Sequence, residues 1–113
     1  MPSPNISRLA QFGPYEFDRL TEIVRIDGEQ VPLSAKEFAL ALLFFENMHR
    51  AMSRGYLLEA LWHSVANLPT RTLDMHVSKV RTKLRLRPEN GYRIVALSGY
   101  GYRMECFPAE DAP

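Results

Sequence analysis

Short β-like stretches separated by turn signals occupy residues 10–33 and predict a small antiparallel sheet. The strongest turn signal is Asp27-Gly28, because both central positions of a type I′ turn require positive φ angles. Residues 30–33 would then form the returning strand of a hairpin. We therefore predict three or four antiparallel strands at the start of the fold.

Three longer segments with helical patterns follow this sheet. Ser34 and Glu37 form a capping box before a strongly apolar helix that extends to about residue 47. A helix of this composition is buried on most sides, so we expect it to belong to the core. Ser53 is the N-cap candidate of a second helix over residues 54–63.

A third helix is predicted over residues 71–86, with Thr70 as its cap and Pro88 beyond its end. Its apolar residues fall within about 60° of helix arc. These residues are Leu73, Val77, Val80 and Leu84. The opposite face presents Arg71, Met75, Ser78, Lys79 and Thr82. Two extended pieces around a Gly-rich turn then predict a hairpin over residues 92–106.

The formal net charge of +1 hides a concentrated basic segment. Residues 71–87 contain six basic side chains and one acidic side chain, for a net +5, whereas the segments before and after each carry −2. Such a segment is the electrostatic footprint that phosphate backbones select. A basic helix face that is merely solvated is the alternative, so charge alone does not decide the function.

Length and composition bound the remaining possibilities. The 113 residues, 46% hydrophobic and 24% charged, fit one globular domain. No apolar stretch approaches the length of a membrane-spanning helix, and no signal-peptide pattern opens the chain. The lone Cys106 excludes an internal disulfide framework and fits a reducing cytoplasm. With three dispersed histidines and one cysteine, we expect neither a metal site nor a cofactor.

Catalysis is also not expected from the residues present. Asp74 and His76 lie two apart on the predicted third helix, so they do not face each other. No nucleophile elbow or P-loop occurs. Asp74 is expected instead to orient a neighbouring arginine.

A helix pair followed by a Gly-rich hairpin is typical of a winged helix-turn-helix, an α+β fold. The motifs also resemble the OmpR/PhoB-type effector domain of two-component response regulators. The residues that carry this resemblance are Leu33-Ser-Ala-Lys-Glu-Phe38, Ser53-Arg54, Leu61-Trp62, Arg71-Thr-Leu-Asp-Met-His-Val-Ser-Lys-Val-Arg-Thr-Lys-Leu84 and Gly99-Tyr-Gly-Tyr-Arg103. The resemblance implies sequence-specific binding of double-stranded DNA to regulate transcription, with the helix at about 71–86 in the major groove. The wing at about 92–106 would lie on the adjacent backbone or minor groove.

Taken with the helix face above, the resemblance implies thirteen DNA-contacting side chains. They are Arg54, Trp62, Arg71, Met75, His76, Ser78, Lys79, Arg81, Thr82, Lys83, Ser98, Tyr100 and Tyr102. It also implies that a loop contacts RNA polymerase, through a sigma factor or the α subunit. The loop residues are Ser64, Val65, Ala66, Asn67 and Leu68. Three residues depart from the family pattern, namely Gly55, His49 and Ser98, the last of which stands where many relatives place a wing arginine.

The domain boundaries and partners follow from the same reading. We expect residues 1–9 to be a linker remnant or flexible leader, residues 10–107 the DNA-binding domain, and residues 108–113 a flexible tail. A receiver domain would precede this unit in the full-length protein. The isolated domain is expected to be a monomer that pairs on tandem DNA half-sites. The alternatives are a winged helix used only for protein contacts, and a one-component or membrane-bound regulator without a receiver.

Overall fold

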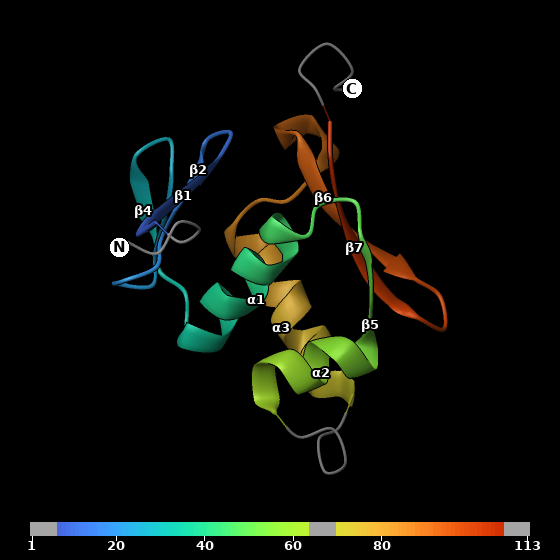
Figure 1. Ribbon diagram of the computed structural model, residues 1–113. Coiled ribbons are helices and arrows are strands. Elements are labelled where there is room, and N and C mark those ends of the chain that lie inside the picture. The colour runs from blue at the N-terminus through green and yellow to red at the C-terminus, as the bar shows by residue number, and fades with distance from the viewer. Residues whose placement is uncertain (1–6, 64–69, 108–113) are drawn as a thin grey trace.

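The computed structural model describes residues 7–63 and 70–107, which form two antiparallel sheets on either side of three helices (Figure 1). The first sheet has the strand order β1-β2-β3-β4. Its strands are β1 (Leu9–Phe12), β2 (Tyr15–Asp18), β3 (Ile23–Ile26) and β4 (Glu29–Val31). Asp27 and Gly28 join β3 to β4 with φ angles of 51° and 84°, which confirms the predicted hairpin. The returning strand begins directly after this turn and ends two residues earlier than predicted.

The folded contacts of the first sheet begin before the predicted boundary at residue 10. Arg8 Nη2 lies 2.9 Å from Asp18 Oδ2, and Asp18 is almost completely buried. A second link runs from Arg19 Nη1 to the carbonyl oxygen of Ser7, at 2.5 Å. Residues 7 to 9 are therefore held against the end of β2.

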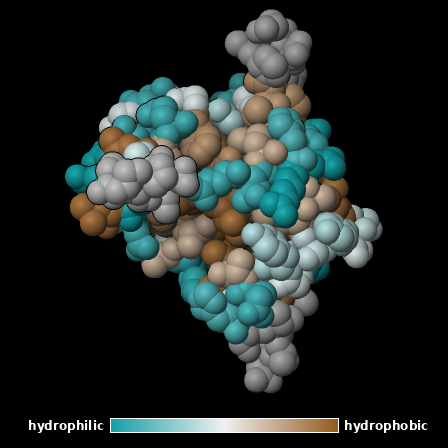
Figure 2. Space-filling view, viewed as in Figure 1, coloured by the Kyte–Doolittle hydropathy of each residue, from teal (hydrophilic) through white to brown (hydrophobic). Residues whose placement is uncertain are grey.

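Helix α1 (Ala35–Glu46) begins at the predicted capping box. The Ser34 hydroxyl accepts from the Glu37 backbone N–H at 3.1 Å, and the Glu37 carboxylate accepts from the Ser34 N–H at 2.9 Å. The inner face of α1 is buried as expected, but its outer face is not. Leu42 and Leu43 line a shallow apolar groove between α1 and α2. Figure 2 shows apolar surface in the middle of this face of the molecule.

Helix α2 (Arg54–Trp62) and helix α3 (Thr70–Lys83) form the helix-turn-helix pair. The Ser53 hydroxyl accepts from Tyr56 N–H at 3.0 Å, so the predicted N-cap of α2 is confirmed. The predicted end of the third helix, at about residue 86, is wrong, because α3 ends at Lys83. Arg85 adopts a left-handed φ of 54°, and Leu86 N–H donates to the Arg81 carbonyl at 3.0 Å. This geometry closes a helix C-terminus, usually with glycine at the left-handed position.

The second sheet contains the predicted wing and one strand that was not predicted. Its order is β5-β7-β6, with β5 (Ala51–Ser53), β6 (Tyr92–Leu97) and β7 (Gly101–Cys106). A 3₁₀ turn (Pro88–Asn90) leads from α3 into β6. The β6–β7 hairpin confirms the predicted wing, and β5 joins the wing to the start of α2. In Figure 1 the turn of the wing points toward the end of the molecule that carries α2.

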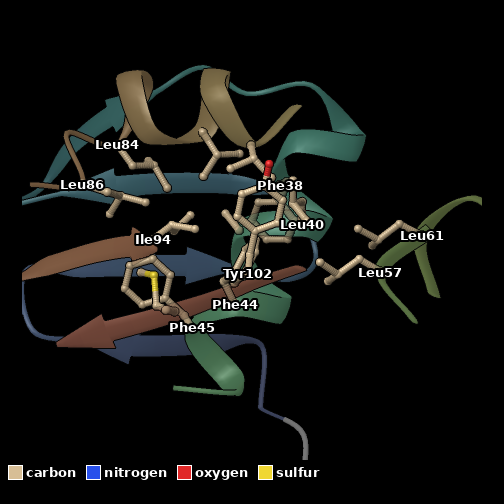
Figure 3. Packing of buried hydrophobic residues seen from close by; sticks show 14 of the residues in the cluster. Phe38, Leu40, Phe44, Phe45, Leu57, Leu61, Leu84, Leu86, Ile94 and Tyr102 are labelled. Carbon is tan, nitrogen blue, oxygen red and sulfur yellow. The ribbon is translucent and has the colours of Figure 1, made fainter. Parts of the chain in front are cut away.

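The core lies where the helices meet the two sheets (Figure 3). The predicted apolar stripe of α3 is fully buried, with 0% exposure at each position. These positions are Leu73, Val77, Val80 and Leu84. Aromatic rings fill the space between the first sheet and α1: Phe17 lies 5.7 Å from Phe38 and 5.1 Å from Phe45 between ring centroids. Since its back is anchored in this core, α3 presents its other face outward.

Candidate nucleic-acid interface

The outward face of α3 carries exposed basic and small polar side chains around one methionine. Arg71, Ser78, Lys79 and Thr82 are exposed, and Met75 is 54% exposed. Within the described part of the chain, neither Arg71 nor Lys79 makes an ion pair. This face therefore offers two cations that form no ion pair with the described carboxylates, although the charge of Lys79 helps to lower the pKa of Glu37.

Lys83 and Arg81 lie at the edges of that face and bond to other parts of the protein. Lys83 Nζ lies 2.8 Å from Glu37 Oε1 on α1. Burial opposes ionisation of Glu37, but hydrogen bonds from Lys83 and Ser34 outweigh it and hold the pKa of the carboxyl below its usual value. Arg81 Nη2 donates to the Ile94 carbonyl at 2.7 Å. Both cations thus tie α3 to its neighbours in the free protein.

Arg54, the first residue of α2, meets α3 and the wing sheet at a single cluster. Its Nη2 atom lies 2.7 Å from Asp74 Oδ1, so the predicted role of Asp74 as an orienter of arginine is confirmed. The Tyr102 hydroxyl, from β7, donates to the same carboxylate oxygen. The Tyr102 ring lies beneath the guanidinium groups of Arg54 and Arg81, with ring-centroid distances of 5.8 and 5.7 Å.

The charges within this cluster are mutually stabilised. Burial raises the pKa of the Tyr102 hydroxyl, and the hydrogen bond to Asp74 raises it further. Burial opposes ionisation of Asp74, yet hydrogen bonds from Tyr102 and Arg54 hold its pKa below the usual value. Asp74 is therefore an anion and Tyr102 a neutral donor at neutral pH. With only 7% of its surface exposed, Tyr102 lies behind the arginines.

Trp62 and His76 form a second contact between α2 and α3. Their rings meet edge to face at 5.1 Å between centroids, and Lys36 lies 5.6 Å from the Trp62 ring centroid. His76 Nδ1 lies 2.8 Å from the Thr72 carbonyl oxygen. Since a carbonyl only accepts, this bond places a proton on Nδ1.

The tip of the wing is exposed and uncharged. Ser98 and Tyr100 lie in the β6–β7 turn, and Arg54 N–H donates to the Tyr100 carbonyl at 3.0 Å. Both nearby arginines pair with one carboxylate. Arg93 Nε and Arg103 Nη2 each lie 2.9 Å from an oxygen of Glu105.

The structure brings the predicted site residues of α2, α3 and the wing onto adjoining elements. It leaves Lys83 on the α1 side and Tyr102 beneath the surface. The predicted polymerase-contact residues 64–68 lie outside the described residues. The shared contact of Asp74 and Tyr102 was not predicted, because these residues lie 28 positions apart and no local pattern joins them.

Other kinds of site find no support among the residues that the structure describes. No group of three His, Cys, Asp or Glu side chains there could hold a metal ion. None of the helices in residues 7–63 and 70–107 has the length and hydropathy needed to cross a membrane.

Comparisons with known proteins agree with this architecture. The sequence profile of the family described as "Transcriptional regulatory protein, C terminal" matches residues 28–104. The sensory transduction protein RegX3 of Mycolicibacterium smegmatis is 34% identical over 93 residues, which cover 82% of this chain and 41% of that protein. The chain thus spans about two fifths of the length of this relative.

Two solved structures share the fold. The RstA DNA-binding domain of Klebsiella pneumoniae, solved in complex with the RstA box, superimposes with a TM-score of 0.75 at 26% identity, covering 88% of this chain and 98% of that one. DrrB, an OmpR/PhoB homologue of Thermotoga maritima, gives a TM-score of 0.73 at 26% identity and covers 88% of this chain and 45% of its own. The chain belongs to the OmpR/PhoB-type family of transcriptional regulatory protein C-terminal domains.

Proposed function

We propose that this domain binds duplex DNA sequence-specifically, as the output domain of a two-component response regulator. The observation that carries the proposal is the outward face of α3, where Arg71 and Lys79 are exposed beside small polar side chains and make no ion pair with any residue that the structure describes. The floor of a major groove offers acceptors for such cations, and thymine methyl groups suit Met75. The complex of the similar RstA domain with its DNA box supports the same assignment.

The other predicted contacts divide by the kind of readout they provide. Arg54, Trp62 and His76 would fix the register on phosphates, which carry no sequence information. The face of α3 would read base edges. The wing tip would position the backbone with little A·T preference, because Ser98 carries no charge and cannot exploit the negative potential of a narrow minor groove.

The proposed assembly is a monomer in solution that pairs on DNA. Two copies would occupy tandem half-sites about 10–10.5 bp apart, one helical turn. Partners of the full-length protein would be a preceding receiver domain and RNA polymerase, the latter through residues 64–68. This function implies a cytoplasmic protein, in agreement with the lone cysteine.

A salt titration tests the proposal directly. The full chain would be offered a duplex library, and its binding to the selected duplex measured by mobility shift at several salt concentrations. Log K should fall with log salt at about −0.9 per neutralised phosphate. A slope near zero contradicts DNA binding and favours a module for protein contacts.

Three alanine variants then separate base reading from backbone contact. Lys79→Ala should relax base preference by about 1–3 kcal/mol. Arg54→Ala should weaken the selected duplex and its single-base variants equally, because a phosphate contact reads no base. The matched control is Arg25→Ala, which removes the same charge from the first sheet, where Arg25 pairs with Glu16. Equal losses in all three variants would indicate a net-charge effect instead of a defined interface.

A further inference from the structure

We propose that Asp74 and Tyr102 are positioning residues that set the specificity of the DNA interface by holding Arg54 in place, without contacting DNA themselves. The inference rests on the proposed function and deepens it, since it assigns how one phosphate contact is prepared. It also changes the expected role of Tyr102 from a DNA contact to an internal support.

The cluster joins all three elements of the proposed interface. Arg54 begins α2, Asp74 lies in the first half of α3, and Tyr102 lies in β7 of the wing sheet. Asp74 Oδ1 accepts from both Arg54 Nη2, at 2.7 Å, and the Tyr102 hydroxyl. A change in the angle between the wing and α3 would therefore break at least one of these bonds.

Tyr102 lacks the chemistry for a direct phosphate contact in this arrangement. A phenolic hydroxyl has one proton to donate, and Tyr102 donates it to Asp74. A phosphate oxygen only accepts, so the remaining lone pairs of the hydroxyl cannot bind it. Tyr102 is also buried, with only 7% of its surface exposed, and the guanidinium groups of Arg54 and Arg81 pack on its ring.

Asp74 is likewise unsuited to a phosphate contact, because its carboxylate would repel a phosphate and its Oδ1 atom already accepts from Arg54 and Tyr102. Its charge therefore lowers the attraction between the domain and every duplex. Asp74 restricts the Arg54 side chain before DNA arrives, so less rotamer entropy is lost when Arg54 binds a phosphate. A guanidinium has five N–H donors, and Arg54 uses some of them on Asp74 and on the Tyr102 hydroxyl.

These two effects of Asp74 act differently on specific and non-specific binding. The repulsion applies to every sequence, whereas the prearranged Arg54 helps only where its phosphate lies in the register that α3 reads. Asp74 thus raises the ratio of specific to non-specific affinity while it lowers non-specific affinity. By contrast, replacing a residue that has a merely structural role would lower the specific and the non-specific affinity together.

The test measures both affinities for the full chain, with the wild-type-selected duplex and a scrambled duplex of equal composition. Asp74→Asn keeps the shape and removes the charge, so non-specific affinity should rise about threefold and the specificity ratio fall about tenfold. Tyr102→Phe keeps the ring and removes the hydroxyl, so the ratio should fall about threefold with little change in non-specific affinity. Tyr92→Phe, at the start of β6 and outside the predicted interface, where the ring packs against Tyr15 and Phe45, is the matched control and should change neither.

A double-mutant cycle shows whether the effect passes through Arg54. In an Arg54→Ala background, Asp74→Asn should no longer lower the specificity ratio. Melting curves of each variant separate misfolding from misplacement, and Tyr102→Phe keeps the test decisive if Asp74→Asn does not fold. An unchanged ratio in a folded Asp74→Asn or Tyr102→Phe variant overturns the inference, as does a full effect without Arg54. Failure of the wild type to bind any duplex overturns the proposed function instead.

Discussion

Gly101 lies where β7 passes β5 with no room for a side chain, so replacing it with alanine gives a sharp test of the fold. A Cβ atom at this position would lie 2.0 Å from the Met52 carbonyl oxygen, 2.9 Å from Ser53 Cα and 3.0 Å from the Arg54 nitrogen. All three are backbone atoms, so no side-chain rotation relieves the contact. The two strands must separate by at least about 1 Å before the closest contact reaches 3.0 Å.

The cost of Gly101→Ala can be worked out from this displacement. Overpacking of this kind costs typically 1–3 kcal/mol, and each strained or lost backbone hydrogen bond adds about 1 kcal/mol. The bond from Arg54 N–H to the Tyr100 carbonyl, 3.0 Å long, lies directly in the affected region. We expect a loss of about 2–4 kcal/mol, which lowers the Tm of a domain of this size by roughly 10–25 °C.

Gly55 supplies the matched control, because the same substitution there should act in the opposite direction. It lies in the first turn of α2, and a Cβ atom at this position meets nothing within 4 Å. Gly55→Ala should raise stability by about 0.5–1 kcal/mol through helix propensity. Thermal and urea unfolding followed by circular dichroism measure both variants. A Gly101→Ala variant as stable as the wild type would refute the geometry of the β5–β7 contact.

Three further predictions concern the wing, the acid limit of stability and a buried hydroxyl. Ser98→Arg should tighten DNA binding roughly three- to tenfold, and more on sites flanked by A-tracts than by G·C pairs; equal binding on both flanks in mobility shifts would argue against the wing account. The hydrogen bond from Arg8 holds the pKa of Asp18 well below its usual value, so this pair's contribution to stability is complete above pH of about 4 and is lost as pH falls below that value. Asp18→Asn should therefore lower stability at neutral pH and flatten its decline in acid, seen in urea midpoints measured from neutral to acid pH; an equally steep decline would contradict this. Tyr15→Phe removes the buried hydrogen bond to the Leu84 carbonyl, 2.7 Å long, and should cost about 1–2 kcal/mol in urea unfolding; an unchanged midpoint would show that the bond contributes nothing net.

Features with a local physical cause were predictable from the sequence. The capping box of Ser34 and Glu37 needs only two residues at the right spacing, and the hairpin at Asp27-Gly28 needs only residues that tolerate positive φ. The buried stripe of α3 followed from helical periodicity. The same local causes placed Ser53 at the start of α2.

Features that depend on distant partners were not predictable. Strand β5 has three residues, too few for an alternating pattern to appear, and it exists because β7 pairs with it. The end of α3 was not predictable for a different, local reason. Arg85 takes the left-handed conformation that ends the helix, and arginine rarely occupies that position. The bond from Lys83 to Glu37, which lies 46 residues away in the chain, has no local pattern that predicts it. The orientation of Tyr102 depended in the same way on a remote carboxylate.

The short strand β5 has a mechanical consequence for how the domain fits a duplex. Ser53 is both the last residue of β5 and the N-cap of α2, and its backbone pairs with Gly101 of the wing sheet. No loop residue separates β5 from α2, so tilting the wing relative to the helix pair would have to break the β5–β7 pairing. If the minor groove is wider or narrower than the wing requires, the wing cannot adjust to it by tilting alone. The duplex itself must bend or twist to meet both surfaces, and the stiffness of each DNA sequence then contributes to its affinity.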